Sequence, residues 1–310
     1  MIELVPYTAE RAEDWNALVA ESRNGTFLID RNYMDYHAHR FADSSYMFYF
    51  KEKLYALLPA CRIEDKLYSH AGLTYGGLIM NEKCTVEKVM AMFESLIPKL
   101  KEDGIKEMIY KPVPYIYHSL PSEEDIYALF RLKASLIGRN VSSTICADNR
   151  LPFKKDRMAA LNKALKADID VKESSNFKVF WNILENNLKE KYESQPVHSL
   201  SEILSLSFKF PDNIKLYCAY QKEKILGGIL CYITKSVVHY QYISATPEGK
   251  KTGAVDAIVS WLLDAYPEKK YFDMGTSNGN NGRCLNESLI YQKEGFGGRA
   301  VCYDIYRITL

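Results

Sequence analysis

The sequence predicts an α+β, sandwich-like protein of two domains, each with a mixed, mostly antiparallel sheet flanked by helices. The chain has 310 residues, which exceeds the usual size of one hydrophobic core. Both halves also share an order of expected elements: two helices, antiparallel strands, a long helix, a strand, a short helix and a last strand. We therefore expect an N-terminal domain at 1–150 and a C-terminal domain at 151–310.

The elements of the N-terminal half follow from apolar spacing and from capping residues. Trp15, Leu18 and Val19 share one side of the first helix. Asp30 is an expected N-cap of the second helix. A Gly-rich loop at 69–77 precedes the long helix. The expected helices are 9–22, 30–40, 85–101 and 122–133, and the expected strands are 2–5, 46–51, 54–61, 106–110 and 135–147.

The C-terminal half begins with a charged segment at 154–166, which we expect to form a bridging helix. Its long helix is amphipathic, with Ile258 and Leu262 on one face and Asp256 and Ser260 on the other. The further expected helices are 174–190, 199–207, 252–266 and 283–293, and the expected strands are 214–220, 224–234, 237–245, 271–277 and 299–308.

Composition and charge argue against several classes of function. Lys and Arg number 40 against 39 acidic residues, and this balance disfavours a general nucleic-acid binder without excluding a local basic groove. The 7 cysteines are scattered and show no C-x-x-C spacing, which disfavours a zinc site or a disulfide framework. The first residues lack a signal-peptide pattern, and no apolar run approaches membrane-span length. We expect a cytoplasmic protein without a metal site or a membrane span.

The most informative segment is 271–282, where an apolar strand opens into a Gly/Asn loop before a helix. Such a loop lets backbone approach a ligand, and the following helix offers free N–H groups. Residues 275–279 also match G-x-S-x-G around Ser277, which is the pattern of a hydrolase nucleophile elbow. That order requires a histidine after the serine, whereas the last histidine is His239. We therefore expect a ligand loop or a plain turn.

Residues 247–254 lie between a strand and the long helix and combine glycines with lysines. They suit a phosphate or pyrophosphate group at a helix N-terminus, and a solvated turn with an N-cap is the equal alternative. The segment is not a P-loop, because Ser244 stands where the first Gly is needed. The residues of this candidate cofactor site are Gly249, Lys250, Lys251, Thr252, Gly253 and Ala254.

Two further groups are open to a functional or a structural interpretation. The loop 69–77 contains His70 and Tyr75, which either bind substrate or belong to a tight connection. Lys293, near a helix C-terminus, either stabilises that helix end or places positive charge in a cleft. Asp273 ends an apolar strand, so we expect it to be partly buried and paired. Its candidate partners are Lys293, Arg283 and Arg299.

The C-terminal residues resemble the ending of FemAB/FemX-like proteins of the GNAT acyltransferase superfamily. That ending has a Phe-Asp-x-Gly-x-Ser strand and loop, followed by a helix that closes with an aromatic residue, x, Lys, two residues and Phe-Gly. Residues 271–277 and 291–297 match it position by position. The resemblance covers most of the chain, because the element order of both halves also fits two tandem GNAT-like domains.

The resemblance implies an N-acyltransferase that joins an acyl group to a primary amine, on a cell-envelope precursor or an amino sugar. Lys293 would stabilise charge at the acyl centre, and Asp273 would orient it or relay a proton. Ser277, Asn278, Arg283 and Asn286 would line the cleft, with His70 and Tyr75 contributed by the N-terminal half.

The implied donor is acetyl-CoA or aminoacyl-tRNA. In GNAT enzymes a Q/R-x-x-G-x-G/A pattern holds the pyrophosphate of coenzyme A, and here Val255 occupies the final Gly/Ala position. That departure counts against acetyl-CoA, and the near-neutral charge gives no support for a large tRNA footprint. The rival to an enzyme is a non-catalytic ligand-binding module with a degenerate donor site. The sequence leaves the oligomeric state open.

Overall fold

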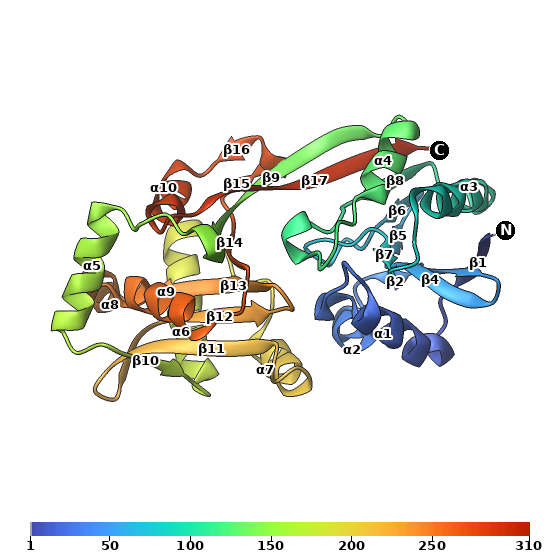
Figure 1. Ribbon diagram of the computed structural model, residues 1–310. Helices are drawn as coiled ribbons and strands as arrows, with labels where there is room; N and C mark the ends of the chain where they lie inside the picture. Colours follow the sequence, from blue (N-terminus) through green and yellow to red (C-terminus); the bar gives the residue numbers. More distant parts are fainter. Residues whose placement is uncertain (1) are drawn as a thin grey trace. The chain divides into compact units, whose positions relative to one another are not determined.

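The computed structural model describes residues 2–310, for Tyr192 the backbone only, and divides the chain into two compact units (Figure 1). Unit 1 comprises the chain up to Val141, Asn278–Leu285 and Cys302–Leu310, and unit 2 comprises Ser142–Ser277 and Asn286–Val301. The predicted boundary at residue 150 thus differs from the observed division, because the chain returns twice to unit 1. The physical reason for the second return is strand pairing, since the end of the last strand, β17 (Arg299–Thr309), pairs with β8 (Glu107–Tyr110) of unit 1.

Unit 1 contains a four-stranded antiparallel sheet in the order β1-β3-β4-β7. A second group of strands surrounds β8, which pairs in parallel with β6 and antiparallel with the end of β17. Its helices are α1 (Ala12–Glu21), α2 (Arg31–Met34), α3 (Val86–Glu102) and α4 (Glu124–Arg131). Its strands are β1 (Ile2–Pro6), β2 (Ala42–Asp43), β3 (Tyr46–Phe50), β4 (Lys53–Leu58), β5 (Cys61–Ile63), β6 (Lys66–Tyr68), β7 (Ile79–Met80), β8 (Glu107–Tyr110), β15 (Asn278–Gly279) and β16 (Cys284–Leu285).

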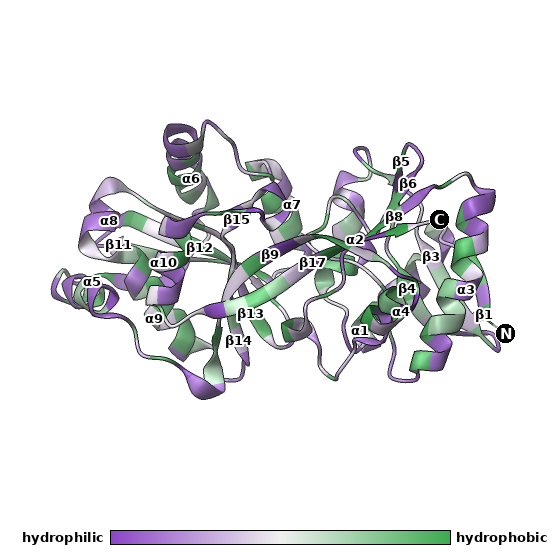
Figure 2. Cartoon of the chain, turned by 90° about the horizontal axis from the view of Figure 1, so that it is seen from above, coloured by the Kyte–Doolittle hydropathy of each residue, from purple (hydrophilic) through white to green (hydrophobic). Residues whose placement is uncertain are grey.

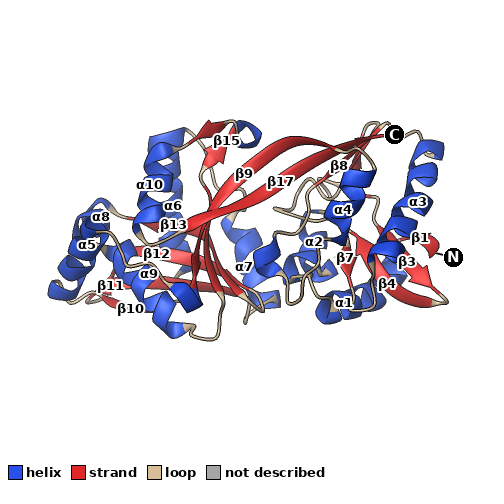
Figure 3. Cartoon of the chain, turned by 45° about the horizontal axis from the view of Figure 1, so that its top comes forward, coloured by secondary structure: helices blue, strands red, loops and turns tan. Residues whose placement is uncertain are grey.

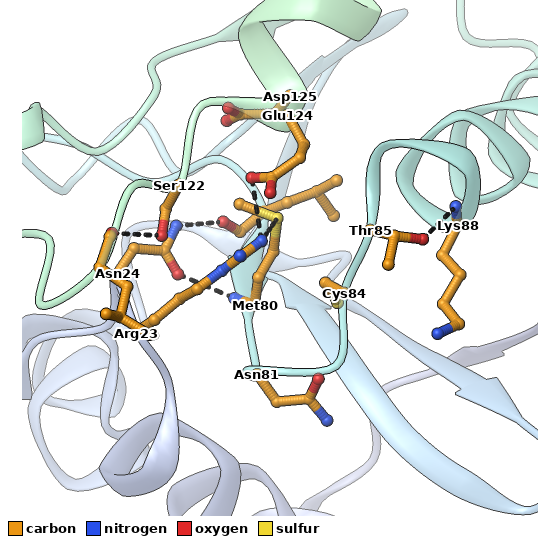
Figure 4. A network of polar contacts seen from close by, with 12 residues as sticks. Arg23, Asn24, Met80, Asn81, Cys84, Thr85, Lys88, Ser122, Glu124 and Asp125 are labelled. Carbon is orange, nitrogen blue, oxygen red and sulfur yellow. Dashed lines mark hydrogen bonds and ion pairs between the residues drawn. The ribbon is translucent and has the colours of Figure 1, made fainter.

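A buried polar network holds the loop after α1 in unit 1 (Figure 4). The Arg23 guanidinium lies 2.9 Å from the Glu124 carboxylate at the start of α4 and is 8% exposed. The Asn24 side chain donates to the Leu78 carbonyl and accepts from the Met80 amide. Because buried polar groups need partners, these contacts tie the loop to β7 and α4 and act as structural links.

Unit 2 is built on a sheet in the order β10-β11-β12-β13-β14-β9, in which only the β13–β14 pair is parallel. Its helices are α5 (Lys155–Lys166), α6 (Phe177–Tyr192), α7 (Leu200–Lys209), α8 (Pro247–Thr252), α9 (Ala254–Ala265) and α10 (Glu287–Gly295). Its strands are β10 (Asp170–Glu173), β11 (Ile214–Gln221), β12 (Lys224–Ile233), β13 (Val237–Ala245) and β14 (Tyr271–Thr276). The long strands β9 (Ser135–Cys146) and β17 (Arg299–Thr309) contribute residues to both units (Figure 3).

Helices α6 and α9 lie on opposite faces of the central strands of this sheet (Figure 2). On the α9 face, Val238 and Phe272 share a buried apolar cluster with Ile258. On the α6 face, the ring of Trp181 packs against that of Tyr242 at 5.3 Å. Because side chains alternate along a strand, each residue of β13 and β14 is committed to one of these two environments.

The predicted α+β class with mostly antiparallel sheets is confirmed, whereas several predicted bounds differ. The predicted helix 283–293 begins only at Glu287, where Asn286 accepts a hydrogen bond from the Leu289 amide as N-cap. The predicted helix 30–40 ends as an α-helix at Met34 and continues as a short 3₁₀ turn. Strand β10 and the two-residue strands were not predicted, because segments this short carry little periodicity.

Candidate active site

The parallel strands β13 and β14 pair only over their first residues. The pairing ends at His239 opposite Asp273, although both strands continue further. Irregular backbone accompanies this end. β13 changes register against β12 after Tyr240, and β14 changes register against β9 after Asp273. Gly275 has φ +76°, a value that favours glycine. Beyond this position β13 and β14 are no longer paired with each other.

A cavity of about 710 Å³ lies beside this region of the two strands. Helix α6, the end of β13, the start of α9, residue 274 of β14, and α10 contribute to its wall. Apolar side chains form much of the lining, and they include Leu184, Ile243, Val259, Met274 and Phe296. The polar lining includes Asn187, Ser244, Lys250, Gln292 and Lys293. A mostly apolar cavity with a few polar groups is typical of a small-molecule site.

Lys293 of α10 lines this cavity and is 6% exposed. Its Nζ donates to the carbonyl oxygens of Gly275 and Thr276, at 2.7 and 2.9 Å. Burial lowers the pKa of Lys293 to about 8, and the negative charge of Asp273 partly opposes that shift. An ammonium group has three N–H donors, so one remains after the two carbonyl contacts. The arrangement suits it to hold a carbonyl oxygen or an anion.

Asp273 is fully buried, and its direct partners differ from the predicted ones. His239 Nδ1 lies 2.7 Å from one carboxylate oxygen. The other oxygen accepts from the hydroxyls of Ser142 and Thr144, the latter at 2.9 Å. Strand alternation explains the difference, because the neighbours of Asp273 along β14 pack in the α9 core and its own side chain faces the other way. Lys293 therefore acts on Asp273 only through space, and Arg283 belongs to unit 1.

The predicted cofactor segment forms helix α8 and its junction with α9, instead of an open loop followed by a helix from residue 252. Thr246 caps α8 by accepting from the Gly249 amide, and Pro247 occupies the first turn. The Lys250 amide is also bonded, to the Thr246 carbonyl. These amides are therefore not available to a phosphate.

The two glycines of this segment serve close packing. A β-carbon at Gly249 would lie 2.1 Å from the Leu226 carbonyl oxygen, and one at Gly253 would lie 2.2 Å from that of Ala160 in α5. Of the six predicted cofactor residues, Lys250 lines the cavity described above, and its Nζ donates to Asn187 Oδ1 at 2.5 Å. The cofactor-binding role of Lys251, Thr252 and Ala254 stays a prediction.

The predicted substrate residues are divided between the units. Ser277 and Asn286 belong to unit 2, while Asn278 and Arg283 belong to unit 1. Ser277 is 1% exposed, and its hydroxyl has no hydrogen-bond partner within residues 2–310. Asn278 is engaged in structure, because its side chain accepts from the Val141 amide and donates to another side chain. Arg283 is exposed.

His70 and Tyr75 are buried inside unit 1. His70 has φ +67°, and its ring lies 5.2 Å from that of His37. Burial, together with nearby positive charge, lowers the pKa of His70 to about 3. The Tyr75 hydroxyl lies 3.1 Å from the Thr26 hydroxyl. The substrate-binding role of both residues stays a prediction.

Sequence reasoning missed His239, Ser142 and Thr144 as parts of the site. His239 served only to argue against a hydrolase, although it is a lone titratable residue between the apolar Val238 and Tyr240 of a strand. A histidine at an interior position of an otherwise apolar strand is a sequence pattern that could have indicated a functional residue. The pairing of β9 with β14, which brings Ser142 and Thr144 to Asp273, joins residues far apart in sequence and has no local signature.

Solved structures with this fold are found, although no protein-family model matches the sequence and no curated protein matches it significantly. The chain is similar to FemX, with a TM-score of 0.70 and 10% identity over 99% of this chain and 97% of FemX. It is also similar to L-PGS from Bacillus licheniformis, with a TM-score of 0.60 and 11% identity over 96% of this chain and 91% of that one.

A tandem GNAT protein from the clavulanic acid biosynthesis pathway has a TM-score of 0.51 and 11% identity, with 100% of this chain and 98% of that chain covered. The predicted resemblance to FemX-like, tandem GNAT proteins is thus confirmed at the level of fold.

Among residues 2–310, no helix is long and apolar enough to cross a membrane. No group of three or more His, Cys, Asp or Glu side chains in the same range is arranged to hold a metal ion.

Proposed function

We propose that the protein is an N-acyltransferase whose chemistry takes place in unit 2. The observation that carries this proposal is the Lys293 ammonium, held by the Gly275 and Thr276 carbonyls beside the cavity where β13 and β14 stop pairing. The fold shared with FemX and with a tandem GNAT protein supports the same reaction class.

In this reaction a primary amine attacks the carbonyl carbon of an activated acyl group. The carbonyl oxygen gains negative charge, and the third N–H of Lys293 stabilises it. Two fixed acceptors on the same ammonium keep that N–H oriented before the substrate arrives, so little reorganisation is needed. Ser277 and Asn286 are not part of the cavity lining, and their substrate-binding role stays a prediction.

The donor is proposed to be acetyl-CoA or aminoacyl-tRNA. Helix α8 occupies the first part of the predicted pyrophosphate segment and uses the Gly249 and Lys250 amides internally, so within this segment the start of α9 is the place left for a pyrophosphate. The acceptor would be a small amine, such as an amino sugar or a peptide amine of a cell-envelope precursor.

The test is acyl transfer from radiolabelled acetyl-CoA and from a set of radiolabelled aminoacyl-tRNAs to a panel of amino sugars and peptide amines. Wild-type protein should label at least one acceptor from one donor class. The K293M variant should fold and lose turnover, with Lys111→Met as a matched control because Lys111 is a partly buried lysine of unit 1 whose pKa burial also lowers to about 8. Equal turnover of K293M and wild type would refute the proposed role.

The alternative is a ligand-binding module without turnover, and the closed α8 segment is the observation that favours it. Isothermal titration with acetyl-CoA, aminoacyl-tRNA and a sugar nucleotide separates the two functions. Binding of the sugar nucleotide alone, without binding of either donor, would favour the module.

A further inference from the structure

The strongest unassigned feature of unit 2 is the pair formed by His239 and Asp273. The two residues face each other across the last paired position of β13 and β14, with His239 Nδ1 and an Asp273 oxygen 2.7 Å apart. Asp273 is fully buried, whereas the His239 side chain is 14% exposed. The carboxylate is therefore inaccessible to solvent, whereas the imidazole is partly exposed.

The contacts of Asp273 fix the state of the ring. The hydroxyls of Ser142 and Thr144 both donate to one carboxylate oxygen, so the other oxygen is left for His239. A carboxylate with these donors favours Nδ1–H on the ring, which makes Nε2 the atom with the free lone pair. Within residues 2–310, His239 Nε2 has no hydrogen-bond partner and is not among the buried unsatisfied atoms. It is therefore free to accept a proton.

The ring also lies close to the residue that carries the Lys293 contact. A β-carbon at Gly275 would be 3.6 Å from His239 Cε1, and the carbonyl oxygen of the same Gly275 accepts from Lys293. The Lys293 ammonium and the His239 ring therefore both lie near Gly275, Lys293 in the cavity lining and His239 next to it in the sheet. Acyl transfer to an amine needs both kinds of group near one carbon atom, the first for the oxyanion and the second for the proton.

We propose that His239 is the proton acceptor of the acyl transfer and that Asp273 is its positioning residue. This inference rests on the proposed function and supplies the general base that the sequence left open. The amine nitrogen forms a bond to the acyl carbon, and the carbonyl electron pair moves to oxygen. His239 Nε2 takes a proton from that nitrogen. The carbon–sulfur or carbon–oxygen bond to the donor then breaks, and the leaving atom receives the proton from His239.

Several charged and polar groups lie around the His239 ring or around its carboxylate partner. Asp273 from β14 is the charged group in direct contact, and Lys293 from α10 interacts with that carboxylate through space. Tyr232 from β12 is the antiparallel neighbour of His239 in the sheet, and Thr144 from β9 adds a neutral hydroxyl. A pH measurement must therefore separate His239 from Lys293.

The experiment uses the full chain, the donor found active with wild type, and the variants His239→Asn, Asp273→Asn and His198→Asn. Asparagine at 239 keeps an N–H to donate to Asp273 but removes the basic Nε2, so a purely structural pair would tolerate it. His198 is the matched control, because it contacts the Tyr242 hydroxyl instead of a carboxylate. We expect H239N to lower kcat by roughly 10²–10⁴-fold and to abolish the acid limb of the kcat/KM profile. We expect H198N to keep both.

A second measurement on wild-type protein guards against misfolded variants. NMR of labelled histidine should show His239 titrating at the pH of the acid limb. D273N should lower kcat and move that limb without a comparable change in KM. An H239N variant with wild-type kcat and an unchanged limb, or a His239 titration that does not coincide with the limb, would overturn the inference. Absence of transfer by wild type from every donor would instead refute the proposed function.

Discussion

Unit 2 contains a buried lysine and unit 1 a partly buried one, and comparison of the two separates the effect of burial from a functional role. Burial lowers the pKa of Lys111 in unit 1 and of Lys293 in unit 2 to the same value, about 8. Both ammonium groups donate to loop carbonyls, Lys111 to Leu73 and Lys293 to Gly275 and Thr276.

The difference lies in what surrounds them. Lys293 lines a cavity of about 710 Å³. It interacts electrostatically with the Asp273 carboxylate, whereas Lys111 interacts electrostatically with the Cys61 thiol. A depressed pKa alone therefore does not identify a site. The cavity and the arrangement of donors and acceptors do.

The largest expected effect comes from removing each lysine in turn. K293M should lower kcat by roughly 10²–10³-fold, because the oxyanion loses its charged donor. K111M should retain kcat, because Lys111 belongs to unit 1 and the proposed chemistry takes place in unit 2. Steady-state kinetics with the active donor measures both. A loss of similar size in K111M would mean that the two lysines are functionally equivalent.

The pH dependence of activity sharpens the same contrast. The wild-type kcat should fall as pH rises through about 8, because Lys293 loses its positive charge there. The K293R variant should have a lower kcat but no such basic limb, since arginine stays protonated. An unchanged basic limb in K293R would assign it to another group.

Stability should depend on both lysines in the same direction. Their folded-state pKa is about 8 against 10.5 in the reference state, so between these values the unfolded chain binds more protons. Stability should therefore rise with pH through this window, by at most about 3 kcal/mol for each lysine. Urea unfolding at a series of pH values measures the slope, and K111M and K293M should each reduce it. A slope that neither variant changes would contradict the assigned shifts.

The glycines offer a smaller, structural comparison between the units. Gly253→Ala should destabilise the protein by about 1–3 kcal/mol, because the residue has φ +81° and a β-carbon would meet the Ala160 carbonyl oxygen. Gly104→Ala is the matched control, since its φ is +75° but nothing lies within 4 Å of a β-carbon. Thermal unfolding should show the larger loss for G253A. Equal losses would mean that the α5 contact contributes nothing.

The smallest expected effect concerns Ser277. We expect no labelling by a fluorophosphonate probe, because the hydroxyl is 1% exposed and no histidine follows it in the chain. Mass spectrometry of the tryptic peptide detects the adduct. A labelled Ser277 would revive the hydrolase interpretation.

Much of the fold could be predicted from sequence, because the long elements carry strong periodicity. The strands β11, β12 and β13 and the helix α3 lie close to their predicted ranges. Long-range pairing was not predictable in the same way. The return of β17 to β8 depends on contacts between distant residues and leaves no local pattern.

The site was predictable in part for the same reason. The motif around Lys293 indicated the residue, and the strand and loop before it indicated its neighbourhood. The partners of Asp273 come from β13 and β9, so only the sheet order could identify them. The α8 segment misled because glycine suggests an open loop, whereas Gly249 and Gly253 here allow close packing.

The course of β17 has a consequence for biosynthesis. Its residues Tyr306–Thr309 complete the edge of β8, and Ile308 is buried in the core of unit 1. The residues that complete this core are synthesised after those of unit 2. Vectorial synthesis therefore leaves an edge of β8 unpaired until unit 2 has been made, and an unpaired strand edge favours aggregation of the nascent chain.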